Sequence, residues 1–295
     1  MHAHHKTYDV IGYVFFYSSV FVNSIMFCRI SVKWPALAAA VEATEEADPL
    51  KDTTVTSRCN RAVVVIATLA LTEHLLMWIS KVARLSDCYP EPRRSYQTFI
   101  HSNYPFVFEL GLPFSLPLAF ALQYVTFITT MNWNYSDVFI ICISYYLRAR
   151  FQQLNNKIND AKGKYVGAWF WRRARSEYTR LVELVHRVDD VISPVVFVSF
   201  ASNLFFICFQ LYYSIAIFFG YERETYLVFS VTLLLLRSVA VSLIAAGVHS
   251  ATLEPAAALY SVPSPVFCIE FSASADRHHG DPGDDNSTFF VPHMD

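Results

Sequence analysis

One stretch of the chain constrains its fold more than any other, because residues 191–221 contain no Asp, Glu, Lys, Arg or His. A bilayer core about 30 Å thick is crossed by about 20 apolar residues in an α-helix. The stretch is long enough to cross with tilt, and it therefore predicts a transmembrane helix. Its interior nevertheless contains the polar side chains of Ser199, Ser202, Asn203 and Gln210. Because such groups are costly against lipid, we expect them to face neighbouring helices or a wet cavity.

The composition supports lipid as the main solvent of the chain. Only 16% of the residues are charged, against about 25% in a typical soluble domain, and 54% are hydrophobic. The formal net charge is −2 and there is no long Lys/Arg run, which argues against a nucleic-acid partner. The six cysteines lie far apart without zinc-ligand spacing, so we expect free thiols, no metal site and no cofactor. No catalytic motif is present, and we predict that the chain is not an enzyme.

Hydropathy predicts an all-α, polytopic transmembrane helical bundle. Arg29 and Lys33 follow the first apolar run, and we expect Pro35 to end its helix. Residues 81–102 have the composition of an aqueous loop, and residues 222–224 of a very short connector. About five spans are expected, at 10–28, 62–80, within 104–147, at 191–221 and at 225–248.

Two amphipathic helices are predicted outside the membrane. Apolar residues recur at helical spacing after the third span, and again after Gly163 and Gly167. The first stripe is Leu147, Phe151, Leu154 and Ile158, and the second is Tyr178, Leu181, Val185 and Val188. We expect the two helices to pack on each other, with a dedicated partner site as the alternative. The segment 148–188 is therefore interpreted as a helical extension of the membrane domain.

The charges orient this arrangement. Ten cations fall between Arg148 and Arg187, and by the positive-inside rule this side is cytoplasmic. The predicted organisation is an N-terminal extension at 1–9 and a transmembrane domain at 10–250 with the cytoplasmic extension at 148–188. A cytoplasmic segment follows at 251–271, and residues 272–295 have the composition of a disordered tail.

Several phrases along the chain resemble one family. They are Lys-Trp-Pro-Ala-Leu at 33–37, Leu-Thr-Glu-His-Leu-Leu at 71–76, Trp-Asn-Tyr-Ser-Asp at 133–137, Val-Asp-Asp-Val-Ile-Ser at 188–193, Ser-Phe-Ala-Ser-Asn-Leu-Phe-Phe-Ile-Cys at 199–208, and Glu-Pro at 254–255 with Ser-Val-Pro at 261–263. In this order and separation they resemble the insect gustatory receptors, and among them the sugar-taste branch. The resemblance covers roughly residues 10–270.

The resemblance implies a plasma-membrane receptor subunit. The resemblance implies a family fold of seven helices with a cytoplasmic N-terminus. It also implies assembly as a tetramer in which the last helix of each subunit lines a cation pore. The five spans would then be the second to sixth helices. This sequence has no counterpart of the family's first helix or of its pore helix, whose terminal signature is Thr-Tyr, five apolar residues and Gln-Phe. The sequence from Ser272 onward also departs from the family. We expect a fragment that forms no pore alone but associates as a homo- or hetero-oligomer with other gustatory receptor subunits.

Ionisable and aromatic residues in the predicted spans are the candidate ligand site, since intramembrane charges are costly and often functional. A sugar needs carboxylate and amide acceptors for its hydroxyls and aromatic faces for its C–H surfaces. With the predicted orientation, the outer halves of the spans supply Glu73, His74, Trp78, Glu109, Gln210, Tyr212 and Tyr213. The alternative is that Glu73 and His74 only hydrogen-bond to other helices. The family resemblance is what supports a sugar ligand.

Arg237 is the single charge in the last span and needs a buried partner. Asp137 and Glu73 are the nearest in predicted depth, and a structural ion pair with Asp137 is expected rather than a ligand role. As a whole, the sequence favours a subunit of a sugar-gated cation channel. The alternative is a non-conducting, membrane-bound binding or regulatory subunit. A transporter ranks third, because no internal repeat or glycine-broken half-helix is seen.

Overall fold

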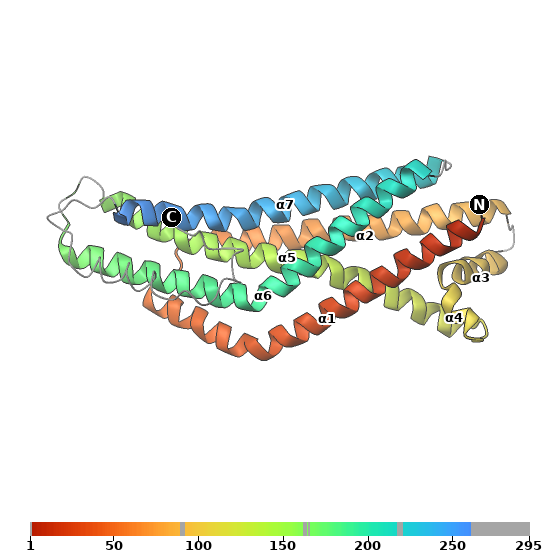
Figure 1. The fold of residues 1–295 in the computed structure, drawn as a ribbon, viewed down its shortest axis with the longest axis horizontal. Coiled ribbons are helices and arrows are strands. Elements are labelled where there is room, and N and C mark those ends of the chain that lie inside the picture. The colour runs from red at the N-terminus through yellow and green to blue at the C-terminus, as the bar shows by residue number, and fades with distance from the viewer. Residues whose placement is uncertain (1, 89–91, 162–163, 165, 217–220, 261–295) are drawn as a thin grey trace. The chain divides into compact units, whose positions relative to one another are not determined.

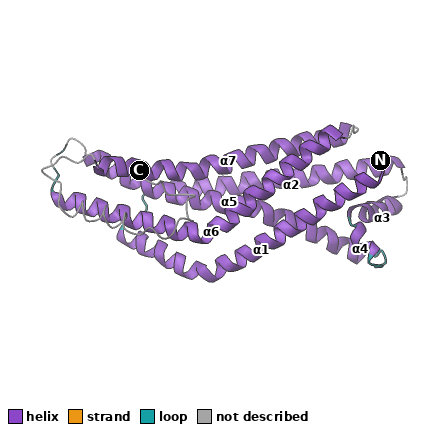
Figure 2. Ribbon diagram, in the orientation of Figure 1, coloured by secondary structure: helices purple, strands orange, loops and turns teal. Residues whose placement is uncertain are grey.

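The computed structural model describes residues 2–88, 92–161, 164, 166–216 and 221–260. Within these residues every regular element is an α-helix, which confirms the all-α prediction (Figures 1 and 2). The elements are α1 (His2–Ala47), α2 (Thr54–Cys88), α3 (Pro92–Asn103), α4 (Pro105–Glu109), α5 (Leu116–Ala161), α6 (Ala168–Ala216) and α7 (Tyr221–Tyr260). The predicted tail at 272–295 lies outside the described residues.

Four helical segments are long and apolar enough to cross a membrane: Ile11–Ala47, Thr54–Ser80, Ala168–Tyr212 and Thr225–Ala256. They correspond to four of the expected spans. The remaining expected span lies in α5, which has 46 residues but is not among these four segments. The middle of α5 contains Asn132, Asn134, Ser136 and Asp137, and these polar side chains lower its hydropathy. Their contacts, given below, are made inside the protein.

Three prolines lie inside long helices rather than at their ends. The predicted stop at Pro35 is wrong, because α1 continues from there to Ala47. Pro194 in α6 and Pro255 in α7 are also internal. A proline removes one backbone hydrogen bond, and a long helix that packs on neighbours tolerates this loss.

Two predicted connectors are helical. Residues 81–102 were expected to be an aqueous loop, but α2 extends to Cys88 and α3 begins at Pro92. Proline suits the first turn of a helix, where its missing N–H would have no partner. The expected connector at 222–224 also belongs to a helix, because α7 begins at Tyr221. A true turn lies between α4 and α5, where Gly111 has φ of +82°.

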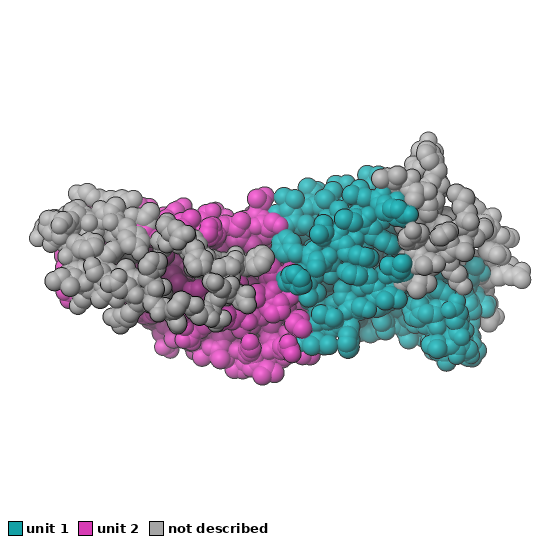
Figure 3. Space-filling model, in the orientation of Figure 1, with its two compact units in different colours: residues 1–25, 62–138, 197–240 teal, residues 26–61, 139–196, 241–295 magenta. Residues whose placement is uncertain are grey.

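The chain divides into two compact units, coloured separately in Figure 3. Unit 1 contains residues 1–25, 62–138 and 197–240, and unit 2 contains residues 26–61, 139–196 and 241–295. By these ranges, α1, α2, α5, α6 and α7 each contribute residues to both units.

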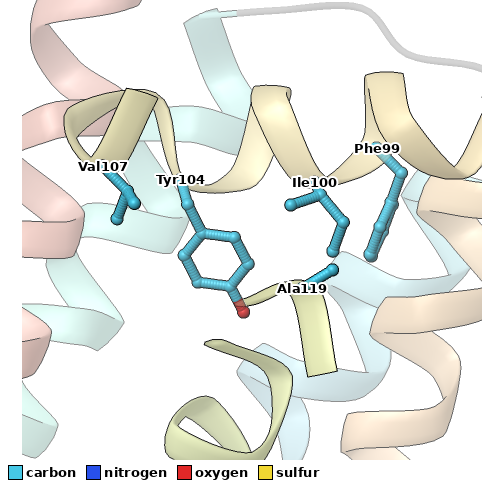
Figure 4. Close-up of a cluster of buried hydrophobic side chains, with 5 residues drawn as sticks. All are labelled: Phe99, Ile100, Tyr104, Val107 and Ala119. Carbon is cyan, nitrogen blue, oxygen red and sulfur yellow. The ribbon is translucent and has the colours of Figure 1, made fainter. Parts of the chain in front are cut away.

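In unit 1, the short helices α3 and α4 pack on the start of α5. Their buried side chains form a hydrophobic cluster that includes Ala119 of α5 (Figure 4). In the figure, Phe99, Ile100, Tyr104 and Val107 project from the α3–α4 segment on one side. The hydroxyl of Tyr104 lies 2.6 Å from the hydroxyl of Thr126. The segment thus covers one end of α5.

In unit 2, the predicted amphipathic stripes form the core. Leu147, Phe151, Leu154 and Ile158 of α5 are buried, as are Leu181, Val185 and Val188 of α6. The rings of Phe151 and Tyr178 have centroids 6.2 Å apart. This contact supports the expectation that the two helices pack on each other.

Two cations of α5 hold the end of α1 in unit 2. Arg150, which is 2% exposed, donates to the carbonyl oxygens of Asp48 at 2.6 Å and Thr44 at 3.3 Å. It thereby satisfies carbonyls at the C-terminus of α1 that have no partner within the helix. Lys157 lies 2.5 Å from the carboxylate of Asp48 and 3.0 Å from that of Glu177 in α6. The last turn of α1 is thus tied to both α5 and α6.

The carboxyl group of Asp48 responds to these contacts. Partial burial by itself raises the pKa of Asp48, but its hydrogen bonds with Lys157, Glu177 and Gln153 together lower the pKa by more than burial raises it. The net result is a pKa below the ordinary value for Asp. The ionised form of Asp48 is therefore the one that the folded protein favours.

Candidate ligand-binding site

Glu73 of α2 is part of a hydrogen-bonded group that joins three helices of unit 1. The hydroxyl of Ser230 in α7 donates to the carboxylate of Glu73. The side-chain amide of Gln210 in α6 donates to the same hydroxyl at 3.0 Å. Ser230 is fully buried, with 0% of its surface exposed. The structure therefore brings together two residues singled out from the sequence, Glu73 and Gln210, through one that was not.

The role of Ser230 was not evident in the sequence. It is a small polar residue within a long apolar run, and serines are common in membrane helices because they can bond to their own backbone. Ser230 is identified only by its neighbour in space, the carboxylate of Glu73, which needs a hydrogen-bond donor in a low-dielectric environment. That neighbour is 157 residues away along the chain.

His74 and Trp78 lie in a different environment from Glu73. Both line a cavity of about 840 Å³ between α2 and α5, in which Glu73 takes no part. The cavity is lined by His74, Leu75, Trp78, Ile79, Val82, Phe120, Gln123, Tyr124 and Phe127. The ring of His74 is 5.7 Å from that of Phe127, and the ring of Trp78 is 5.1 Å from that of Phe99 in α3. These two candidates are thus part of an aromatic, largely apolar wall.

Two of the remaining candidates are exposed. Glu109 is exposed at the end of α4, and Tyr212 of α6 is 50% exposed. Neither of them lines the cavity between α2 and α5. The side chain of Tyr213 is outside what the structure describes. The structure therefore separates the predicted site into a hydrogen-bonded group around Glu73, an aromatic cavity beside it in sequence, and two more accessible residues.

Arg237 of α7 is paired with Asp137 of α5. Its Nε lies 2.8 Å from a carboxylate oxygen of Asp137, and the two side chains are 7% and 0% exposed. The other carboxylate oxygen of Asp137 accepts from Ser199 of α6 at 2.5 Å. Arg237 also donates to Asn134 and, at 3.1 Å, to Asn203. This buried network joins α5, α6 and α7 and leaves neither charge alone.

A second group of hydrogen bonds joins α1 to α5. Asn23 donates to Asn132 at 2.9 Å and to the hydroxyl of Ser136 at 2.7 Å. Asn132 in turn donates to Ser24 at 2.7 Å. The polar residues in the middle of α5 thus face other helices of unit 1, as hydrogen-bonding groups in a membrane should.

Chemically, the Glu73 group is suited to recognising hydroxyls. A carboxylate accepts hydrogen bonds, an amide accepts and donates, and a serine hydroxyl does both. Among the described residues, no set of three His, Cys, Asp or Glu is placed to hold a metal ion. The group therefore has the chemistry of a polar binding site rather than of a metal centre.

These features define a multi-pass helical membrane protein whose polar side chains meet in the interior. Comparison with known proteins makes the assignment specific: the profile of the trehalose receptor family matches residues 3–279, and the chain belongs to this family. The match ends within the segment 272–295, for which the sequence predicts a departure. The resemblance to sugar-taste gustatory receptors is confirmed.

Similar proteins are known in Drosophila melanogaster. The chain is 28% identical over 271 residues to the gustatory receptor for sugar taste 64f, covering 90% of the chain and 57% of that receptor. It is 30% identical over 268 residues to the gustatory receptor 5a for trehalose, covering 88% of the chain and 59% of the relative. It is 28% identical over 272 residues to the gustatory receptor for sugar taste 64a, covering 89% and 59%. The chain thus spans less than two thirds of the length of these relatives, all of which are named as gustatory receptors.

Proposed function

We propose that the chain is a subunit of a sugar-taste receptor and that Glu73 accepts hydrogen bonds from the hydroxyls of the sugar. The observation that carries the proposal is the group formed by Glu73, Ser230 and Gln210 at the meeting of three helices. Membership of the trehalose receptor family and the names of the relatives support a sugar as the ligand.

The physical reason is the cost of keeping a carboxylate in an apolar span. Glu73 lies within the span Thr54–Ser80, where an ionisable residue marks a functional position by default. Its hydrogen bond to Ser230 is of the same kind as a bond to a sugar hydroxyl, so one can replace the other at little cost. The site thus combines a stable resting state with the capacity to exchange partners.

For the whole receptor we propose a sugar-gated cation channel in the plasma membrane, formed as a homo- or hetero-oligomer of gustatory receptor subunits. The family resemblance supports this activity. The alternative, a non-conducting binding or regulatory subunit, is distinguished by measuring sugar-dependent current from the chain alone and from the chain expressed with other subunits. Sugar binding without current in both settings favours the alternative.

Binding is tested directly with the purified chain in lipid nanodiscs and a panel of sugars that begins with trehalose. Glu73→Gln keeps the shape of the side chain but removes its charge, and a hydrogen bond to a charged group contributes about 1.5–3 kcal/mol. We expect the affinity for the sugar to fall about tenfold or more. Glu42→Gln, which changes an exposed carboxylate in unit 2, should leave the affinity unchanged.

Two outcomes contradict the proposal. If the folded chain binds no sugar of the panel, the ligand class is wrong. If Glu73→Gln reduces the yield of monodisperse protein as strongly as it reduces binding, Glu73 has the structural role that the sequence left open. Ser230→Ala separates these roles, because it keeps the carboxylate and removes only its donor.

A further inference from the structure

Two cysteines from different helices meet in unit 2. Cys59 of α2 and Cys142 of α5 are 83 residues apart along the chain, yet the Sγ of Cys59 donates to the backbone carbonyl oxygen of Cys142 at 3.9 Å. The two side chains also make hydrogen-bonding contact with each other. Both thiols are free and half-buried. The fold thus holds two sulfur atoms side by side.

This contact is close to the geometry of a disulfide, in which the Cα atoms are about 4.4–6.8 Å apart. The carbonyl oxygen of Cys142 is about 2.4 Å from the Cα of the same residue. The sulfur of Cys59 therefore lies within roughly 6 Å of that Cα. A change from one staggered χ1 rotamer to the next moves a cysteine sulfur by about 3 Å while the backbone stays in place. Rotation of the side chains can thus bring the two sulfurs together.

We propose that Cys59 and Cys142 are a redox-sensitive thiol pair that forms a reversible disulfide between α2 and α5. The inference rests on the contact of the two residues and does not depend on sugar binding. The oxidant is a peroxide such as hydrogen peroxide, which takes two electrons from the pair of sulfurs.

The reaction has two steps. In the first, the thiolate of one cysteine attacks a peroxide oxygen and the O–O bond breaks, which gives a sulfenic acid and, after protonation, a water molecule. In the second, the sulfur of the other cysteine attacks the sulfenic sulfur, the S–O bond breaks and a second water molecule leaves. Two thiols and one hydrogen peroxide therefore give one disulfide and two water molecules.

The surroundings of the pair affect the two steps differently. Partial burial slows the first step, because the thiolate is the reactive form and is less stable away from water. The second step is fast, because the partner thiol is already in contact and reacts within the same molecule. A sulfenic acid formed at either cysteine is therefore captured by the other before it is oxidised further.

Both cysteines lie near the side of the membrane that is expected to be cytoplasmic. Cys59 is five residues after Thr54, where the span of α2 begins, and Cys142 is six residues before Arg148, where the predicted cytoplasmic extension begins. Cytosolic thiols are kept reduced, and disulfides that form there are usually transient and serve in redox sensing. The bond should thus form under oxidative stress and be opened again by cellular thiols.

The test is oxidation of the whole chain in lipid nanodiscs. The protein is purified with its thiols reduced and treated with hydrogen peroxide, the remaining thiols are alkylated, and the peptides are mapped by mass spectrometry without reduction. We expect the peptide joined through Cys59 and Cys142 to form in several-fold higher yield than any other disulfide, and dithiothreitol to remove it.

The exposed residues Cys28 and Cys208 are the internal comparison. Disulfides distributed equally among the cysteines would overturn the proposal. So would a peroxide concentration that oxidises Cys28 and Cys208 but leaves Cys59 and Cys142 available for alkylation, because contact between the two thiols would then not be enough for a bond.

Serine variants test the pair by a second measurement. A disulfide between residues 83 positions apart restricts the unfolded chain, so peroxide should raise the melting temperature of the wild-type protein by several degrees. The shift should be absent in Cys59→Ser and Cys142→Ser and retained in Cys208→Ser. An equal shift in Cys59→Ser would show that another thiol is responsible and that the proposal is wrong. If a serine variant fails to fold, the peptide map of the wild-type protein decides the question.

Discussion

Removing one member of the Arg237–Asp137 pair should destabilise the protein more than any single change on its surface. Asp137→Asn leaves the guanidinium of Arg237 with Asn134 and Asn203 but removes the carboxylate with which it is paired. Breaking a buried ion pair on one side costs about 3–5 kcal/mol, because the remaining charge stays in a low-dielectric environment. This corresponds to a decrease of about a hundredfold or more in the ratio of folded to unfolded protein.

The assay is the free energy of unfolding of the purified chain in bicelles, measured for a double-mutant cycle. Asp137→Leu with Arg237→Met removes both charges, and the cost of the double variant should be well below the sum of the two single costs. The matched control is Arg187→Met. Arg187 and Glu183 form an ion pair at 2.9 Å in which both side chains are more than half exposed. Because solvent screens such a pair, its loss should cost less than about 0.5 kcal/mol.

Two results would refute this reasoning. One is a cost below about 1 kcal/mol for Asp137→Asn, which would mean that the pair is hydrated in the membrane-embedded protein. The other is strict additivity in the cycle, which would mean that Arg237 is held by Asn134 and Asn203 and is indifferent to the charge of Asp137.

Two further predictions concern topology and pH. The segment 148–188 is expected to be cytoplasmic, so a membrane-impermeant thiol reagent applied outside intact cells should label Ser102→Cys and not Asp160→Cys. Both positions are exposed. The reverse labelling pattern would show that the orientation in the membrane is inverted. The pKa of Asp48 is lowered in the folded state, so its stabilising effect is fully present above the ordinary Asp pKa near 4 and is lost as the pH falls from there through the lower pKa of the folded state. Asp48→Asn should therefore lower the melting temperature at pH 7, and this effect should shrink steadily as the pH falls below about 4, whereas Asp160→Asn, an exposed control, should have little effect at any pH.

The sequence was sufficient to predict the helices that are governed by local pattern. Long apolar runs located four spans, and the repeat of Leu147, Phe151, Leu154 and Ile158 predicted the buried face of α5. The ends of helices were less predictable from the sequence. The composition of a segment indicates whether water or lipid surrounds it, but not whether its backbone is hydrogen-bonded as a helix. Residues 92–103 are polar and proline-led, yet they form α3 because Phe99 and Ile100 bury one face against α5. Tertiary packing thus overrode a loop-like composition.

The contacts of the candidate site were harder to predict for a different reason. Consecutive residues of a helix point about 100° apart, so Glu73 and His74 were expected in one pocket but belong to different surroundings. Which residue faces the interior depends on the rotation of each helix about its axis. That rotation is decided by partners far along the chain, such as Ser230 for Glu73 and Asn134 for Arg237.

Helix α7 shows how few residues decide this rotation. Ser230 and Arg237 are seven residues apart, two turns, and therefore lie on the same face about 10 Å from each other along the axis. Ser230 bonds to α2 and α6, and Arg237 to α5 and α6. In an apolar solvent that gives no hydrophobic preference between faces, these bonds select the orientation of α7 within unit 1. A rotation that frees one of them also breaks the other, so the two groups stabilise a single orientation and their contributions to stability should not be additive.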